Sequence, residues 1–177
     1  LEKIISTRKP IILSSGMSSL SELDRTVSFL KSRNADFSIL QCTTSYPTKP
    51  HQYGLNVIGE LRNRYNIKVG YSDHTEGVEV SVAAVALGAK IIEKHFTLEK
   101  KLPGPDHKAS LDPNELNILV NQIRNVEKAI QGSGLKTLHY SEREIKKIVQ
   151  KGIYLAKKIS KGEFITDDHL IMKRPVS

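Results

Sequence analysis

Two histidines, each ending a strand-like segment, constrain the fold of this chain more than any other feature. One apolar run ends in Gly-Tyr-Ser-Asp-His-Thr at residues 70–75, and the next ends in Ile-Ile-Glu-Lys-His-Phe-Thr at residues 91–97. An Ala/Val-rich segment of helical character, Gly77 to Gly88, separates them. This pattern predicts a strand–helix–strand unit whose parallel strands lie about 5 Å apart. His74 and His95 should then end neighbouring strands at one sheet edge, where both can reach one ion or substrate.

The alternation of side chains along each strand supports a site at this edge. Ser72 shares a strand face with His74, and Glu93 shares one with His95. Because ligands bind at the carboxyl ends of parallel strands, these polar groups predict a binding site. A Pro-Gly-Pro-Asp-His loop follows at residues 103–107.

The whole chain repeats this strand–helix pattern. Four strand segments are expected, at residues 9–14, 37–42, 67–71 and 89–93. Such alternation with short connections predicts parallel strands and right-handed crossovers. Ser21 with Asp24 is expected to begin the first helix, and a second helix is expected at residues 56–65.

The helix after the fourth strand has the clearest signals. Asp112 and Pro113 supply an N-cap and a proline at the first helical position. Apolar residues at helical spacing predict its buried face: Leu116, Leu119, Val120, Ile123, Val126 and Ile130.

Charge and apolar content limit the class of partner. The chain carries 27 Lys and Arg against 19 Asp and Glu, but the basic residues are scattered rather than clustered, which favours anionic small molecules over nucleic acid. No apolar run approaches the roughly 18 residues of a membrane helix, and the start at Leu1 shows no signal-peptide pattern. A single cysteine, Cys42, excludes an internal disulfide and fits the cytoplasm. We interpret Cys42 as a buried strand residue rather than a reactive thiol.

A change in composition marks the C-terminal part. Residues 137–151 are charged and compatible with a helix, and residues 152–163 suggest two strands joined by a tight turn. Residues 166–170 resemble a capped helical turn. This part is too short to hold a core of its own.

Taken together and in order, five motifs resemble the sialic acid synthase family, which comprises the N-acetylneuraminate, legionaminate and related nonulosonate synthases. They lie at residues 11–17, 42–47, 70–74, 93–97 and 104–107. The resemblance implies an α/β fold, the second half (strands five to eight) of a TIM (β/α)8 barrel. It places this half-barrel at residues 1–135, a linker at 136–152 and the start of an antifreeze-like (SAF) domain at 153–177.

The same resemblance implies a transferase of carbohydrate biosynthesis. Such an enzyme condenses phosphoenolpyruvate with an N-acetylated hexosamine such as N-acetylmannosamine, giving N-acetylneuraminate or a related nonulosonate plus phosphate. His74 and His95 match the family's ligands for a divalent cation, most commonly Mn²⁺, with Mg²⁺ or Co²⁺ as alternatives. The family also implies a domain-swapped homodimer.

Other site residues follow from the resemblance. Ser14, Thr44 and Ser72 match positions that contact phosphoenolpyruvate, whereas Tyr46 and Asp106 match positions that hold the acceptor sugar. Asp106 and Glu93 are the expected catalytic carboxylates: the first assists proton transfer and the second orients a ligand or water near the metal. The role of His107 is left open.

Structural alternatives exist for each residue. The two histidines could be hydrogen-bonded structural residues rather than ligands, and the Pro-Gly-Pro loop could be only a rigid turn. Ser14 and Ser72 could cap the following helices, Tyr46 could pack, and Glu93 could pair with Lys94 or another basic group. At the level of function, the alternatives are another phosphoenolpyruvate- or aldehyde-condensing TIM barrel enzyme, or a non-catalytic binding fragment. Because the family's phosphate-binding lysines lie on the first four strands, we expect the chain alone to be inactive, with two open sheet edges.

Overall fold

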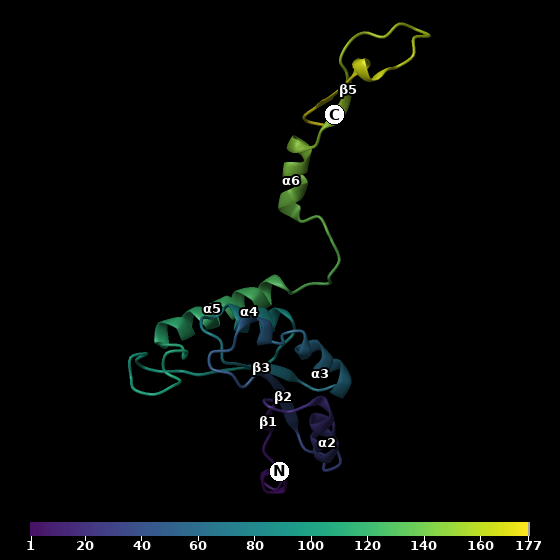
Figure 1. Ribbon diagram of the computed structural model, residues 1–177. Coiled ribbons are helices and arrows are strands. Elements are labelled where there is room, and N and C mark those ends of the chain that lie inside the picture. The colour runs from purple at the N-terminus through teal and green to yellow at the C-terminus, as the bar shows by residue number, and fades with distance from the viewer. Residues whose placement is uncertain (177) are drawn as a thin grey trace. The chain divides into compact units, whose positions relative to one another are not determined.

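The computed structural model describes residues 1–176 and divides into two units, which separate after Gln131. The first unit contains one parallel sheet with the strands in sequence order (Figure 1). The strands are β1 (Ile11–Ser14), β2 (Phe37–Cys42), β3 (Val69–Asp73) and β4 (Ile92–Lys94). All neighbouring pairs are parallel, as the alternating pattern predicts.

Helices precede, connect and follow these strands. They are α1 (Glu2–Ile5), α2 (Leu20–Lys31), the 3₁₀ turn η1 (Pro50–Gln52), α3 (Val57–Tyr65), α4 (Glu79–Ala86) and α5 (Pro113–Ala129). Of these, α2, α3 and α4 lie in the three crossovers, whereas α1 comes before β1 and α5 comes after β4. The core lies between the helices and one face of the sheet, where strand residues such as Ile39 and Tyr71 pack with Leu30, Ile58 and Leu61.

The opposite face of the sheet is more open and is the inner face of a curled half-barrel. Ile12 on this face is 57% exposed, whereas Leu40 is buried. Leu40 lies over Gly70, where an added Cβ would come within 2.5 Å of the Ile91 carbonyl oxygen and of Leu40 itself. Glycine at position 70 therefore leaves room for the Leu40 side chain on the inner face of the sheet. Four parallel strands of this kind form part of a TIM barrel.

Several predicted boundaries differ from the structure: β1 begins at Ile11 rather than at residue 9, and β4 spans Ile92–Lys94 rather than residues 89–93. The cap of α2 is Ser19 rather than Ser21: its side chain accepts a hydrogen bond from the Glu22 amide, and Glu22 Oε2 accepts one from the Ser19 amide at 2.8 Å. This reciprocal pair satisfies two free amides, which Ser21 with Asp24 does not do. Strand β3 also extends to Asp73, which places Ser72 and Asp73 in the sheet itself.

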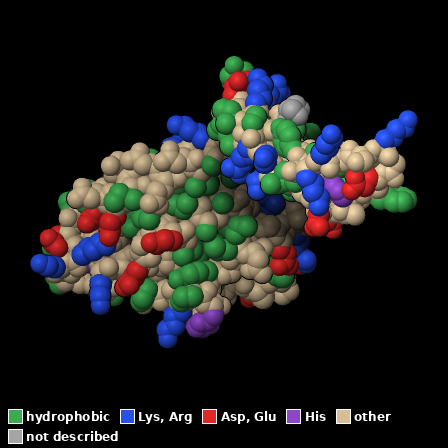
Figure 2. Space-filling model, turned by 90° about the horizontal axis from the view of Figure 1, so that it is seen from above, with side chains coloured by type: hydrophobic (Ala, Val, Ile, Leu, Met, Phe, Trp, Pro, Cys, Tyr) green, Lys and Arg blue, Asp and Glu red, His purple; other side chains and the backbone are tan. Residues whose placement is uncertain are grey.

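Helix α5 begins as predicted but is buried less than predicted. Asp112 caps it through the Glu115 amide at 2.8 Å, and Pro113 is its first residue. Of the six residues of the expected buried face, Leu119 is buried, whereas Leu116, Val120 and Ile130 are 39%, 45% and 57% exposed. The reason is a groove of about 360 Å³ between α5 and β4 that no described segment fills. Figure 2, a view from above, shows apolar side chains exposed among charged ones on the surface of the molecule.

The second unit contains α6 (Tyr140–Val149), β5 (Gly152–Leu155), the 3₁₀ turn η2 (Asp167–His169) and β6 (Leu170–Lys173). The predicted turn at 166–170 is present, but β5 pairs antiparallel with β6 rather than with a strand before residue 163. Among residues 132–176, His169 alone is buried, so this unit has no apolar core. The predicted linker at 136–152 and antifreeze-like start at 153–177 stay predictions.

No helix within residues 1–176 combines the length and apolar character that crossing a bilayer requires.

Candidate functional site

The carboxyl ends of β3 and β4 bring the two predicted histidines together. Ser72 and Glu93 lie opposite each other in the sheet, and the Ser72 hydroxyl donates to Glu93 Oε1 at 2.7 Å. Beyond them the rings of His74 and His95 lie 5.2 Å apart, nearly perpendicular at 82°. The strand order and the parity of the side chains therefore produce the expected juxtaposition.

Tyr46, from the loop after β2, completes a cluster of three rings. Its ring centroid lies 4.2 Å from that of His74 and 5.4 Å from that of His95. Partial burial of the phenol raises the pKa of Tyr46, and the negative charges of Asp106 and Glu93 raise it further. The phenol is therefore a neutral hydrogen-bond donor at pH 7. The packing role that was the alternative for Tyr46 does occur, but against the two imidazoles rather than in the core.

The orientation of His74 is set by a backbone carbonyl. Its ring is buried, and Nδ1 lies 3.0 Å from the Thr43 oxygen. Because a carbonyl only accepts, Nδ1 carries the proton and donates it, which leaves the Nε2 lone pair available. Metal-binding histidines have this arrangement. Cys42 is buried as predicted, with its Sγ 3.9 Å from the same nitrogen.

Asp106 reaches the cluster because the loop after β4 doubles back. The Leu111 amide donates to the His95 carbonyl and the Thr97 amide donates to the Leu111 carbonyl, both at 2.9 Å. Inside this closed loop Gly104 has a φ of 143°, which favours glycine. Asp106 Oδ2 lies 3.7 Å from His95 Nδ1.

Two further contacts hold this loop in place. His107 Nδ1 lies 2.7 Å from Thr97 Oγ1, and the Ser110 hydroxyl donates to the Asp106 carbonyl at 2.7 Å. His107 therefore anchors the loop that presents Asp106.

Ser14 and Thr44 lie at the ends of the other two strands. Ser14 is exposed at the end of β1, and its hydroxyl accepts from the Gly16 amide at 3.4 Å. Ser19 caps α2 and no side chain caps α4, so the capping alternative is wrong for both Ser14 and Ser72.

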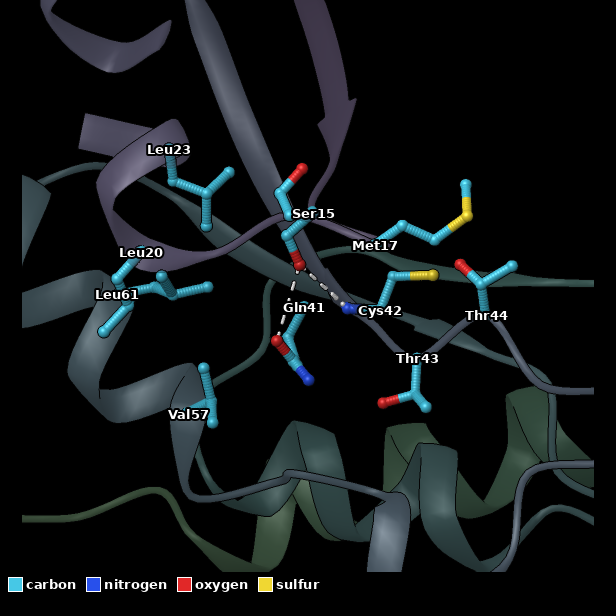
Figure 3. Close-up of a pocket in the computed structure, with 11 residues that line it drawn as sticks. Ser15, Met17, Leu20, Leu23, Gln41, Cys42, Thr43, Thr44, Val57 and Leu61 are labelled. Carbon is cyan, nitrogen blue, oxygen red and sulfur yellow. Dashed lines mark hydrogen bonds between the residues drawn. The ribbon is translucent and has the colours of Figure 1, made fainter. Parts of the chain in front are cut away.

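Thr44 borders a hollow of about 480 Å³ beyond the end of β2 (Figure 3). Ser15 and Gln41 lie in its polar wall, where Ser15 Oγ accepts from the Cys42 amide at 3.1 Å. Leu20, Leu23, Val57 and Leu61 supply the apolar side. None of the three rings lines this hollow, so Thr44 borders a space that Tyr46, His74 and His95 do not.

The donor atoms fit a divalent cation held in part by this chain. No group of three or more His, Cys, Asp and Glu side chains converges as a metal site within residues 1–176. The two imidazoles, with the Asp106 carboxylate beside His95, would leave other coordination positions to water or substrate. Open coordination is typical of catalytic rather than structural metal sites.

Our sequence reasoning missed two groups that shape the site. The Thr43 carbonyl carries no side-chain signal. Asp73 and Lys94 form an ion pair on the opposite face of the same strands, so the alternative in which Glu93 pairs with Lys94 is wrong. A signal for the ion pair was available in the sequence: Asp73 lies between two site residues at the end of one strand, and Lys94 lies at the equivalent place in the next strand.

A curled parallel α/β sheet with polar groups at its carboxyl edge defines a barrel-type protein with a strand-end ligand site. The particular family follows from comparison: the family model described as NeuB family matches residues 1–136. The chain belongs to this family, the sialic acid synthases.

Characterised relatives match the chain over nearly its whole length. The chain is 44% identical to N,N'-diacetyllegionaminic acid synthase of Campylobacter jejuni over all of its residues and 54% of the relative. It is 41% identical to human N-acetylneuraminate-9-phosphate synthase over 98% of the chain and 48% of the relative. The chain thus spans about half the length of the curated relatives it matches.

Solved structures of other proteins also superpose on this chain. N-acetylneuraminic acid synthetase from Leptospira borgpetersenii, solved with citrate, superposes with a TM-score of 0.74 at 38% identity, over 81% of this chain and 50% of the other. A DAHP synthase from Thermotoga maritima superposes with a TM-score of 0.62 at 18% identity, which shows the shared fold alone.

Proposed function

We propose that this chain supplies half of the active site of a nonulosonate synthase, which condenses phosphoenolpyruvate with an N-acetylated amino sugar and releases phosphate. One observation carries the proposal: Tyr46, His74, His95 and Asp106 gather at the carboxyl edge of a parallel sheet in a chain whose relatives are named as such synthases. The relatives named differ in product, so the proposal extends to the acceptor class and not to one sugar.

His74 and His95 would hold a divalent cation, with Mn²⁺ as our first choice. When bound, such an ion polarises the carbonyl of the acceptor sugar as a Lewis acid. The Thr43 carbonyl supports this role from the protein side, because it keeps the proton of His74 on Nδ1 and the Nε2 lone pair free.

The remaining residues would bind and orient the two substrates. Ser14, Thr44 and Ser72 offer hydroxyl donors to the oxygen anions of phosphoenolpyruvate. The neutral Tyr46 phenol and the exposed Asp106 carboxylate would hydrogen-bond the hydroxyls of the sugar, and Asp106 could also accept or return a proton there.

Ser72 and Glu93 would act together. The Ser72 proton points to Glu93 in the structure. Donation to a bound phosphoenolpyruvate would turn this proton away and leave the Glu93 carboxylate free to accept from a water. Glu93 would thereby orient the attacking water.

Cation binding can be tested on the chain itself by following imidazole NMR signals during a Mn²⁺ titration. We expect selective paramagnetic broadening of the His74 and His95 signals, and loss of the tight site in His74→Gln and in His95→Gln. His51→Gln, which changes an exposed histidine in η1, is the matched control. Equal broadening of all imidazoles in the parent chain would contradict a site at these two rings.

Activity can be tested by replacing the matching half of the Campylobacter jejuni relative with this chain in one polypeptide. We expect Mn²⁺-stimulated phosphate release from phosphoenolpyruvate with N-acetylmannosamine or a bacillosamine-derived acceptor, and none from the chain alone. Asp106→Asn should lower turnover about 100-fold, because proton transfer by a positioned group contributes this much. A folded, Mn²⁺-binding chimera that releases no phosphate with any acceptor would refute the proposal.

A further inference from the structure

A buried ion pair lies directly behind the ring cluster, on the opposite face of the same two strands. Lys94 Nζ lies 2.9 Å from Asp73 Oδ2, and the two side chains are 4% and 0% exposed. Asp73 and Lys94 are also register partners in the sheet. Asp73 stands between Ser72 and His74 in the chain, and Lys94 stands between Glu93 and His95.

The pair belongs to a network that encloses the turn carrying His74. Lys94 Nζ also donates to the Thr75 carbonyl at 2.6 Å, and the Thr75 amide donates to Asp73 Oδ1 at 2.8 Å. The Ser81 hydroxyl, from α4, donates to Asp73 Oδ2. The residues on both sides of His74 are therefore fixed from behind, by β4 and by α4.

We propose that Asp73 and Lys94 form a positioning clamp that sets the spacing and orientation of His74 relative to His95. This inference rests on the proposed function for its consequence, the affinity for the cation. Its geometric part concerns the metal-free chain alone. A buried pair of opposite charges is weak evidence of stabilisation, because desolvation offsets the attraction. Its directional hydrogen bonds, however, specify one geometry for the turn.

The chemistry of buried ion pairs suggests how to separate positioning from stability. Lys94→Met leaves the Asp73 charge buried without its partner and should strongly destabilise the chain. The double variant Asp73→Asn/Lys94→Met removes both charges, and Asn keeps an oxygen for the Thr75 amide. We expect the double variant to recover most of the stability but not the clamp, because the donor to the Thr75 carbonyl is gone.

The main readout is the contact between the His74 and His95 rings in the metal-free chain, measured as NMR cross-relaxation between their ring protons. We expect this contact to weaken in the folded double variant, and its affinity for Mn²⁺ to fall at least tenfold, the lower end of the effect of outer-shell partners. The matched control is Asp24→Asn/Arg64→Met, which removes an exposed ion pair between α2 and α3. This control should leave both quantities unchanged.

The outcomes are distinct. A folded double variant with the parental ring contact and Mn²⁺ affinity would overturn the clamp and leave the pair a structural feature. If the parent chain binds no Mn²⁺ but the ring contact is lost in the double variant, the clamp stands and the metal proposal fails. Should the double variant not fold, Ser81→Ala decides: it keeps both charges but removes one hydrogen bond to Asp73. Here we expect a weaker ring contact with unchanged folding, and an unaltered contact would overturn the clamp.

Discussion

At the scale of single residues, the site depends on which face of a strand a side chain occupies. Ser72 and His74 point to the inner face, whereas Asp73 between them points to the helices and meets Ser81 and Lys94. The same alternation separates Glu93 and His95 from Lys94. Two short segments, one at the end of each strand, therefore carry both the candidate ligands and the charged groups behind them.

Thr75 tests whether every buried polar atom of this turn has a hydrogen-bond partner. Its hydroxyl is the buried side-chain polar atom that has no hydrogen-bond partner in the part of the chain described. Valine has nearly the same shape without the hydroxyl, so we expect Thr75→Val to raise the free energy of unfolding by about 1 kcal/mol. Chemical denaturation monitored by circular dichroism measures this change.

Thr97→Val is the control for this prediction, because the Thr97 hydroxyl donates to the Glu99 carbonyl at 3.1 Å and also contacts His107. This substitution should lower the free energy of unfolding. A loss of stability in Thr75→Val would show that the Thr75 hydroxyl is satisfied, for example by an ordered water.

At the scale of elements, local sequence signals predicted where α5 begins more accurately than they predicted how much of it is buried. Asp112 and Pro113 mark the start of α5 because capping depends only on adjacent residues. Burial of the apolar face of α5 depends on neighbours far away in the chain. This helix packs on α4, but the groove between α5 and β4 stays open. The apolar pattern therefore predicted a larger buried face than the structure has.

The difference in burial along α5 predicts that truncating its apolar side chains lowers the free energy of unfolding by unequal amounts. Leu119→Ala should lower the free energy of unfolding by about 3 kcal/mol, because it empties a packed position. Leu116→Ala should cost less than about 1 kcal/mol, since Leu116 is 39% exposed. Thermal or urea unfolding of the two variants compares them directly. Equal costs would indicate that another surface covers Leu116 in solution.

At the scale of the whole molecule, the sheet has two free edges, β1 and β4, within residues 1–176. Unpaired strand edges beside exposed apolar groups favour pairing with another chain. We expect the isolated chain to self-associate in a concentration-dependent way, measured by size-exclusion chromatography with light scattering.

Ile12→Lys should shift this equilibrium toward the 19.8 kDa monomer, because it places a charge on the inner face of edge strand β1. Met17→Lys, at an 89% exposed position in a loop, is the control and should not. A strictly monomeric parent chain at all concentrations would contradict the prediction.

The sequence by itself determined the alternation of strands and helices in the first unit, the parallel sheet and the presence of His74 and His95 at adjacent strand ends. These properties follow from periodicity, turn residues and parity, which act over a few residues. Only the tertiary structure decided that Asp106 folds back beside His95, that the Thr43 carbonyl orients His74, and that Asp73 pairs with Lys94. Such contacts join residues whose distance in space is set by chain reversal and packing, and no local pattern encodes that distance.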